Sequence, residues 1–228
     1  MTASTAPVAR TPLHEWHVAH GADMIVHNGW QIARAYSGVE REVEAARAGL
    51  AWADVSASSK LSLRGRGIPA LVRTWTPDSP ALKPLGVARL RGPEPALACR
   101  LTEDHLLLLA LGETLPRFDR PGEPIVTMDA TSAYAGFFLV GPRTENLLRR
   151  MTALDVRPRA LPPNSCAETQ LAGVEALLVR TPETVLPALR IYVAWDMAEY
   201  VGERMEESGR DLGITPLGVD GLRSLMQI

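Results

Sequence analysis

Long apolar runs are missing from this sequence. The longest, residues 106–111 (LLLLAL), is strand-sized and falls far short of the roughly 20 residues that a membrane-spanning helix needs. The first residues, MTASTAPVARTP, lack the apolar core of a secretory signal. We therefore expect a cytoplasmic protein with a short disordered lead-in over residues 1–10 and no association with membranes.

Cysteines are scarce, and neither charge sign is in excess. Cys99 and Cys166 lie far apart and neither belongs to a CxxC pair, so we expect them to be unpaired small residues of the core in a reducing compartment. The 24 Lys and Arg nearly balance the 26 Asp and Glu, which leaves a formal net charge of -2. This balance gives no general attraction to nucleic acid.

Motifs that would by themselves define an active site are also absent. The stretch Arg64–Gly67 (RGRG) contains two glycines, but no phosphate-binding GxGxxG or GxxxxGK[ST] pattern follows, so we expect a turn there. There is no GxSxG elbow. His14, His17 and His20 are spaced i, i+3, i+6, and two of them could bind a metal from one helical face. Without a Cys or carboxylate at ligand spacing, ordinary helix-surface histidines are favoured over a metal site.

Periodic apolar positions predict a mixture of strands and helices with several hairpins. Strands are expected at 60–64, 86–90, 96–101, 105–111, 126–131, 135–140, 165–171, 174–180 and 188–194. Helices are expected at 13–20, 38–49, 68–75, 143–152, 197–209 and from about 217. Hairpins, such as the one around Ala172-Gly173, favour an α+β fold over a doubly wound sheet. We expect one domain over residues 11–228, with a possible internal boundary near 115–125.

Local patterns make three further predictions. Thr11 followed by Pro12 is typical of a helix N-cap and first turn. In the second helix the alternate acids Glu40, Glu42 and Glu44 are expected to be mostly solvated. The last segment, Leu217–Ile228, ends on apolar side chains that need cover, either from the chain's own core or from another chain.

Short motifs also occur in order along nearly the whole chain. They are TPLHEWH (11–17), HGADM (20–24), NGW (28–30), AGLAWADVS (48–56), KLSLRG (60–65), LTEDH (101–105), TS (131–132), FLVGP (138–142), AGV (172–174) and GVDGLRSL (218–225). This ordered set resembles the glycine-cleavage T-protein (aminomethyltransferase) folate-binding family, including members like the gamma subunit of sarcosine oxidase. The resemblance implies an α+β fold of antiparallel sheets with packed helices around a central opening for tetrahydrofolate, here without the family's C-terminal barrel.

The resemblance also assigns site residues, with departures from the family pattern. The acidic pair of the family's GGxxDDL loop corresponds to Glu94-Pro95, so Glu94 takes the catalytic and folate-side carboxylate role. The family's His-Met after DVS becomes Ala57-Ser58, and Leu111 stands where the family has Asn. Arg190 lies in the divergent counterpart of GELGYELYV. The implied cofactor-binding residues are Ser58, Glu94, Leu111 and Arg190, with no metal site.

Two functions therefore stay open. The first is a subunit of a one-carbon, demethylating complex like sarcosine or dimethylglycine oxidase, with weakened catalysis. The second is a minimal tetrahydrofolate-dependent aminomethyl- or methyltransferase. Because buried pterin donors and acceptors left without partners cost about 1–3 kcal/mol each, the departures above favour the first. The resemblance implies a homo- or hetero-oligomer, with a flavoprotein or barrel-bearing subunit as partner.

Overall fold

A computed structural model describes residues 7–75, 82–112, 114–117, 124–182 and 184–226. Most of the expected lead-in, the middle of the 115–125 connector and Ile228 lie outside this range. No helix within it is long and apolar enough to cross a membrane.

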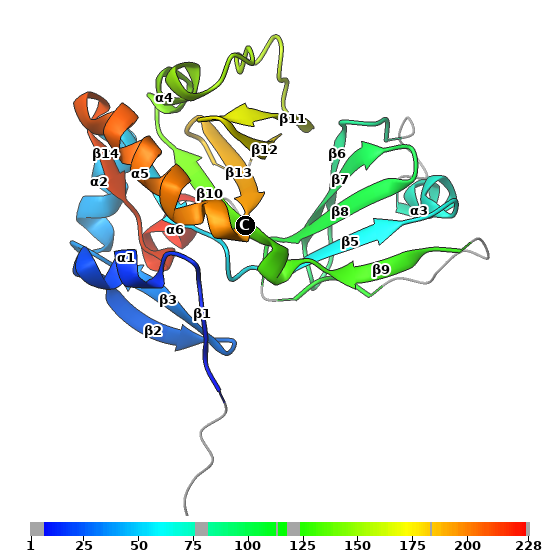
Figure 1. Cartoon of the computed structure of the whole chain (residues 1–228), viewed down its shortest axis with the longest axis horizontal. Coiled ribbons are helices and arrows are strands. Elements are labelled where there is room, and N and C mark those ends of the chain that lie inside the picture. The colour runs from blue at the N-terminus through cyan, green and yellow to red at the C-terminus, as the bar shows by residue number, and fades with distance from the viewer. Residues whose placement is uncertain (1–6, 76–81, 113, 118–123, 183, 227–228) are drawn as a thin grey trace, which may run out of the picture.

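Three open sheets form the framework (Figure 1). The smallest has the order β1-β3-β2, from Ala9–Arg10, Trp30–Ala35 and Asp23–His27. The second has the order β11-β12-β13-β10-β4-β14, from Ser165–Leu171, Val174–Arg180, Ala188–Ala194, Tyr134–Val140, Leu50–Asp54 and Ile214–Pro216. The third has the order β6-β7-β8-β5-β9, from Val87–Leu90, Ala96–Thr102, His105–Ala110, Lys60–Arg64 and Val126–Asp129. Pairing is antiparallel except at β1–β3 and β14–β4, which confirms the α+β class.

Turn chemistry explains several of the strand ends. Ala172 and Gly173, between β11 and β12, both have positive φ, at 50° and 87°, which matches the right-handed twist of a two-residue hairpin. Gly65 ends β5 with φ 144°, and a Cβ there would lie 2.2 Å from the carbonyl oxygen of Pro124. The RGRG stretch is thus a turn, as predicted.

The helices pack on both faces of the six-stranded sheet and on one face of the five-stranded sheet. Their bounds are α1 His14–Ala19, α2 Val39–Ala48, α3 Ile68–Trp75, α4 Thr144–Met151, α5 Ala198–Gly209 and α6 Val219–Leu225. The predicted N-cap at Thr11 is wrong: Leu13 occupies the cap position of α1, no side chain caps the helix, and Thr11 supplies only a backbone carbonyl to the N–H of His14. The cause is that residues 11–13 form a preceding turn.

The core consists of apolar layers on both faces of the six-stranded sheet. On one face Phe137 packs with side chains from α4 and α5, and on the other Phe138 packs with α2 and α6. The five-stranded sheet packs against the second face through a cluster that includes Cys99 and Cys166, while α3 covers its outer face. Both cysteines are free and buried, as predicted.

The prediction of a solvated Glu42 is wrong. Its side chain is 2% exposed, because Oε1 accepts the backbone N–H groups of Tyr36, Ser37 and Gly38 and Oε2 accepts that of Gly218. Glu42 therefore joins the start of α2 to the start of α6. The apolar end of α6 is covered by the chain's own core, where Leu225 is buried.

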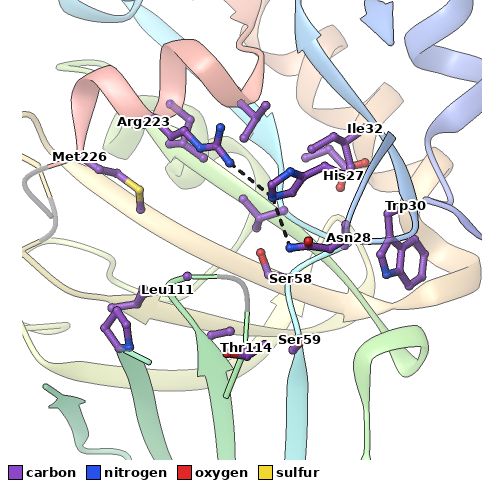
Figure 2. Close-up of a pocket in the computed structure, with 18 of the residues that line it drawn as sticks. His27, Asn28, Trp30, Ile32, Ser58, Ser59, Leu111, Thr114, Arg223 and Met226 are labelled. Atoms are coloured by element: carbon purple, nitrogen blue, oxygen red, sulfur yellow. Dashed lines mark hydrogen bonds between the residues drawn. The ribbon is translucent and has the colours of Figure 1, made fainter. Parts of the chain in front are cut away.

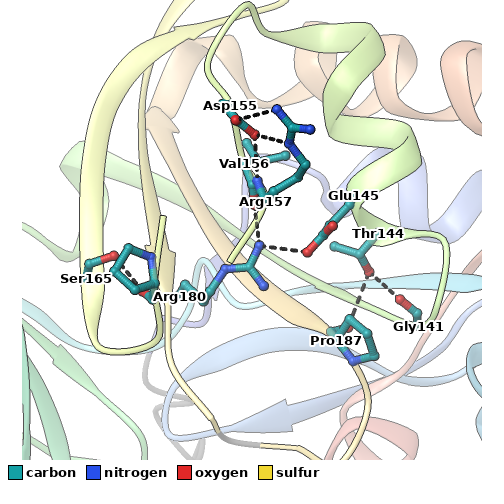
Figure 3. Close-up of polar contacts among 10 residues, drawn as sticks. Gly141, Thr144, Glu145, Asp155, Val156, Arg157, Ser165, Arg180 and Pro187 are labelled. Carbon is teal, nitrogen blue, oxygen red and sulfur yellow. Dashed lines mark hydrogen bonds and ion pairs between the residues drawn. The ribbon is translucent and has the colours of Figure 1, made fainter. Parts of the chain in front are cut away.

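Polar contacts fix the start of α4 and the long connection after it (Figure 3). The hydroxyl of Thr144, which is fully buried, donates to the carbonyl oxygen of Gly141 at 2.8 Å and also lies 3.3 Å from that of Pro187. The buried Arg180 of β12 donates to Glu145 at 3.1 Å and to the carbonyl of Val156. These bonds connect α4 to the six-stranded sheet.

Candidate functional site

A cavity of about 600 Å³ lies where the three sheets approach one another. Its walls come from the β2–β3 hairpin, the β4–β5 connection, the neighbouring ends of β7 and β8, strand β13 and helix α6. Figure 2 shows His27, Trp30, Ser58, Leu111 and Arg223 around it. The volume lies within the range of roughly 300–1,000 Å³ that is typical of small-molecule sites.

The β4–β5 connection is held in a tight turn that shapes one wall. The N–H of Ser56 donates to Asp54 Oδ1 at 2.8 Å, and the N–H of Ser58 donates to the carbonyl of Val55 at 3.2 Å. The ammonium of Lys60 donates to the carbonyls of Ser56 and Ser58 at 2.8 and 3.0 Å. Together these bonds place Ser58 at the cavity.

Lys60 is itself buried, with 1% of its surface exposed. Burial lowers the pKa of Lys60 to about 8, since it disfavours the charged ammonium. The negative charges of Asp54 and Asp129 act against this decrease, and the positive charge of Arg190 adds to it. Lys60 therefore lies close enough to two charged lining residues, Asp54 and Arg190, for their charges to influence its pKa.

A chain of three side chains runs behind the same wall. Asp54 Oδ2 accepts a hydrogen bond from His17 Nε2 at 2.9 Å, and His17 Nδ1 lies 2.6 Å from the hydroxyl of Tyr36. Burial disfavours the ionised form of Asp54, but hydrogen bonds from His17 and Ser56 outweigh it and lower its pKa. Burial, with the charges of Asp54, Glu42 and Glu206, raises the pKa of Tyr36, so its hydroxyl stays protonated.

Three of the four predicted binding residues line the cavity: Ser58, Leu111 and Arg190. Arg190 is 3% exposed and its guanidinium lies over the ring of Phe138, 4.9 Å from the centroid. Glu94 is not among the lining residues. Its carboxylate accepts a hydrogen bond of 3.0 Å from the hydroxyl of Thr114, which does line the cavity.

Of the three histidines in and just after α1, His14 and His17 are not the surface residues that the spacing suggested, while His20 is one. His17 is fully buried against Asp54 and His14 is 8% exposed, whereas His20 is exposed and stacks on Trp16. The described residues contain no group of three or more His, Cys, Asp or Glu placed to hold a metal ion. The surface prediction failed because the partner of His17 is 37 residues away in the sequence.

Sequence reasoning missed most of the polar lining. His27 Nε2 lies 3.3 Å from Asn28 Nδ2 and 3.5 Å from Arg223 Nη2, so it acts as the acceptor between a loop and α6 (Figure 2). Asp54 was missed as well, although a single acid that ends the apolar strand Leu50–Ala53 is a usable signal.

Known structures share this fold. The chain is similar to glycine cleavage system aminomethyltransferase T from Bartonella henselae, with a TM-score of 0.75 and 18% identity over 96% of this chain and 62% of that one. It is also similar to a chain of heterotetrameric sarcosine oxidase from Corynebacterium sp. U-96, with a TM-score of 0.61 and 19% identity over 90% of this chain and 97% of that one. The fold is thus of the T-protein type.

The sequence gives the family directly. The chain belongs to the GCVT N-terminal domain family, whose model matches residues 13–91 and 96–226. Among curated relatives, the aminomethyltransferase of Geobacillus kaustophilus is 28% identical over 230 residues and that of Bacillus subtilis is 27% identical over 227 residues. Each alignment covers 92% of this chain and 61% of the relative, so the chain spans about three fifths of their length.

Proposed function

We propose that this chain is a ligand-binding subunit of a one-carbon, demethylating complex, with a cavity that holds a reduced folate and with weakened transfer chemistry. The observation that supports this most is the separation of the cavity from Glu94. The cavity is large enough for a ligand, but the carboxylate that the family resemblance assigns to catalysis is bound to Thr114 and does not line it.

The subunit role is supported by the likeness to one chain of a multi-subunit enzyme. The fold matches that sarcosine oxidase chain with a TM-score of 0.61. The sarcosine oxidase is heterotetrameric. By analogy we infer that this chain assembles with other subunits, and that a flavoprotein or a barrel-bearing protein is among them. The apolar end of α6 adds no support, because Leu225 lies in the chain's own core.

Tetrahydrofolate fits the cavity in part. A ring edge with N–H donors would find an acceptor in Asp54, and acceptor groups on the ligand would find donors in Ser58 and Arg190. When bound, tetrahydrofolate supplies nitrogens that carry a one-carbon unit. The residues of this chain would orient that ligand and exclude water, while no described lining residue other than Asp54 offers a carboxylate to exchange protons.

A minimal aminomethyltransferase is the second candidate. The higher TM-score with aminomethyltransferase T favours it, as does the position of Glu94, one hydrogen bond away from the lining residue Thr114. A rotation of the Glu94 side chain would then have to bring its carboxylate to the ligand during turnover.

Calorimetric titration with tetrahydrofolate separates the two. For a subunit with weakened chemistry we expect a Kd weaker than about 10 μM that is unchanged in Glu94→Ala, because this carboxylate does not line the cavity. If the wild type binds with a Kd below about 10 μM and Glu94→Ala abolishes this binding, the enzyme is established instead. The paired measurement is co-purification from the native source, where flavin absorbance in the complex supports the subunit role and a lone active chain contradicts it.

A further inference from the structure

The cavity wall contains a carboxylate to which the family resemblance gives no role. Asp54, the last residue of β4, lines the cavity while only 5% of its side chain surface is exposed. It is the one acidic side chain among the described lining residues. A carboxylate in such a place is costly to bury unless it is paired and hydrogen-bonded, so its contacts show what keeps it there.

Those contacts leave part of the carboxylate available. Oδ1 accepts the N–H of Ser56 at 2.8 Å and Oδ2 accepts Nε2 of His17 at 2.9 Å. The side chain of Ser56 is a third hydrogen-bond partner of this carboxylate. An ionised carboxylate has about four acceptor positions, so three are occupied. The remaining position can receive one donor from a ligand in the cavity that Asp54 lines.

The residues behind Asp54 fix its orientation. The Tyr36 hydroxyl lies 2.6 Å from Nδ1 of His17 and the Asp54 carboxylate 2.9 Å from Nε2. With the Nε2 proton donated to Asp54, a neutral imidazole leaves Nδ1 to accept the hydroxyl of Tyr36. His17 is fully buried, and Tyr36 and Trp16 contact its ring edge to face. The imidazole is therefore held in one orientation, with one nitrogen toward the carboxylate.

We propose that Asp54 is the recognition group of the cavity for a cationic or N–H-donating nitrogen of the ligand, with His17 and Tyr36 as positioning residues. Two sources share this chemistry: a protonated methylated amine, and the N–H edge of a reduced pterin. The indole of Trp30 lines the same cavity and adds an aromatic face that attracts cations (Figure 2). The pterin source rests on the proposed function, whereas the amine source does not.

The test compares two probes, dimethylammonium chloride and tetrahydrofolate, on the full chain by NMR titration. Asp54→Asn removes the charge but keeps an oxygen for the N–H of Ser56, so the turn can persist. Asp211→Asn is the matched control, since Asp211 is an exposed acid whose partner Arg150 lies outside the cavity lining. We expect Asp54→Asn to weaken binding of at least one probe about tenfold or more, with Asp211→Asn unchanged.

The outcomes distinguish this inference from the proposed function. If dimethylammonium binds through Asp54 and tetrahydrofolate does not bind, the inference stands and the folate assignment fails. If tetrahydrofolate binds equally to the wild type and to Asp54→Asn, the folate assignment stands. The inference about Asp54 is then overturned if dimethylammonium binding is also unchanged in Asp54→Asn. Binding of neither probe to the wild type at about millimolar concentration overturns both.

A second variant covers the case in which Asp54→Asn does not fold. Tyr36→Phe removes only the hydroxyl that contacts Nδ1 of His17. We expect probe binding to fall about threefold and the ¹⁵N spectrum of His17 to change from one tautomer to a mixture, because a positioning role acts through that proton. An unchanged tautomer together with unchanged affinity would contradict the positioning role.

Discussion

Replacing the buried Glu42 by Ala tests how the cavity wall is held in place. This one carboxylate accepts four backbone N–H groups, three at the start of α2 and one from Gly218 at the start of α6, at distances of 2.6–3.2 Å. Hydrogen bonds to a charged group contribute about 1.5–3 kcal/mol each, but water can reach the part-buried amides in the variant. We therefore expect a loss of about 3–5 kcal/mol of stability.

For a chain of this length such a loss lowers the Tm by about 10 °C. Thermal and urea denaturation, followed by circular dichroism, measure it. Glu44→Ala is the matched control, because Glu44 lies on the same helix and is exposed, so its change should stay within about 0.5 kcal/mol. Equal Tm values for Glu42→Ala and Glu44→Ala would refute the assignment of Glu42 as the link between α2 and α6.

Three further predictions concern stability. The buried Lys60 has a pKa of about 8 against an ordinary 10.5, so the unfolded state binds more protons between these pH values. The free energy of unfolding should therefore rise by about 3 kcal/mol as the pH increases across that window. Urea denaturation should show this rise flattened in Lys60→Met and kept in the control Lys83→Met. Gly141→Ala should lower the free energy of unfolding by about 3 kcal/mol or more in urea denaturation, because φ is 133° and the new Cβ would lie 2.5 Å from the carbonyl oxygen of Gly49. Gly173 also has a positive φ but has open space around it, so an equal loss in Gly173→Asn would argue against this steric cause. Phe137→Ala, in the core, should cost about 3–5 kcal/mol in the same assay, and a change below 1 kcal/mol would contradict its packing role.

Many of the strand positions could be predicted because their signals are local, whereas β3, β4 and β14 were not predicted. The bounds of β5, β11, β12 and β13 coincide with the predicted 60–64, 165–171, 174–180 and 188–194. In each of these, apolar alternation or a continuous apolar run is bounded by residues with turn preferences, as at Ala172-Gly173. Helix ends were less exact, since at α1 a turn over residues 11–13 replaces the expected cap.

The buried polar residues could not be predicted because their partners are remote in sequence. Glu42 has the spacing of a solvated helical acid, and only Gly218, 176 residues away, shows that its carboxylate faces inward. The same holds for His17 and its partner Asp54. Pattern reasoning along one segment has no access to such contacts.

The candidate site was found from motif order rather than from residue chemistry. The family resemblance led to Ser58, Leu111 and Arg190, which the fold brings together around one cavity. It gave no role to Asp54, His27 or Arg223, because their significance depends on how three sheets and α6 meet. The roles of the predicted residues in binding and catalysis remain predictions.

The most direct test of the central claim is a crystal structure of the chain grown with tetrahydrofolate. The account predicts the reduced pterin in the cavity between the three sheets, with a ring nitrogen within hydrogen-bonding distance of Asp54 and with Glu94 still bound to Thr114. A pterin that is contacted by the carboxylate of Glu94 instead, or that binds outside this cavity, would contradict it.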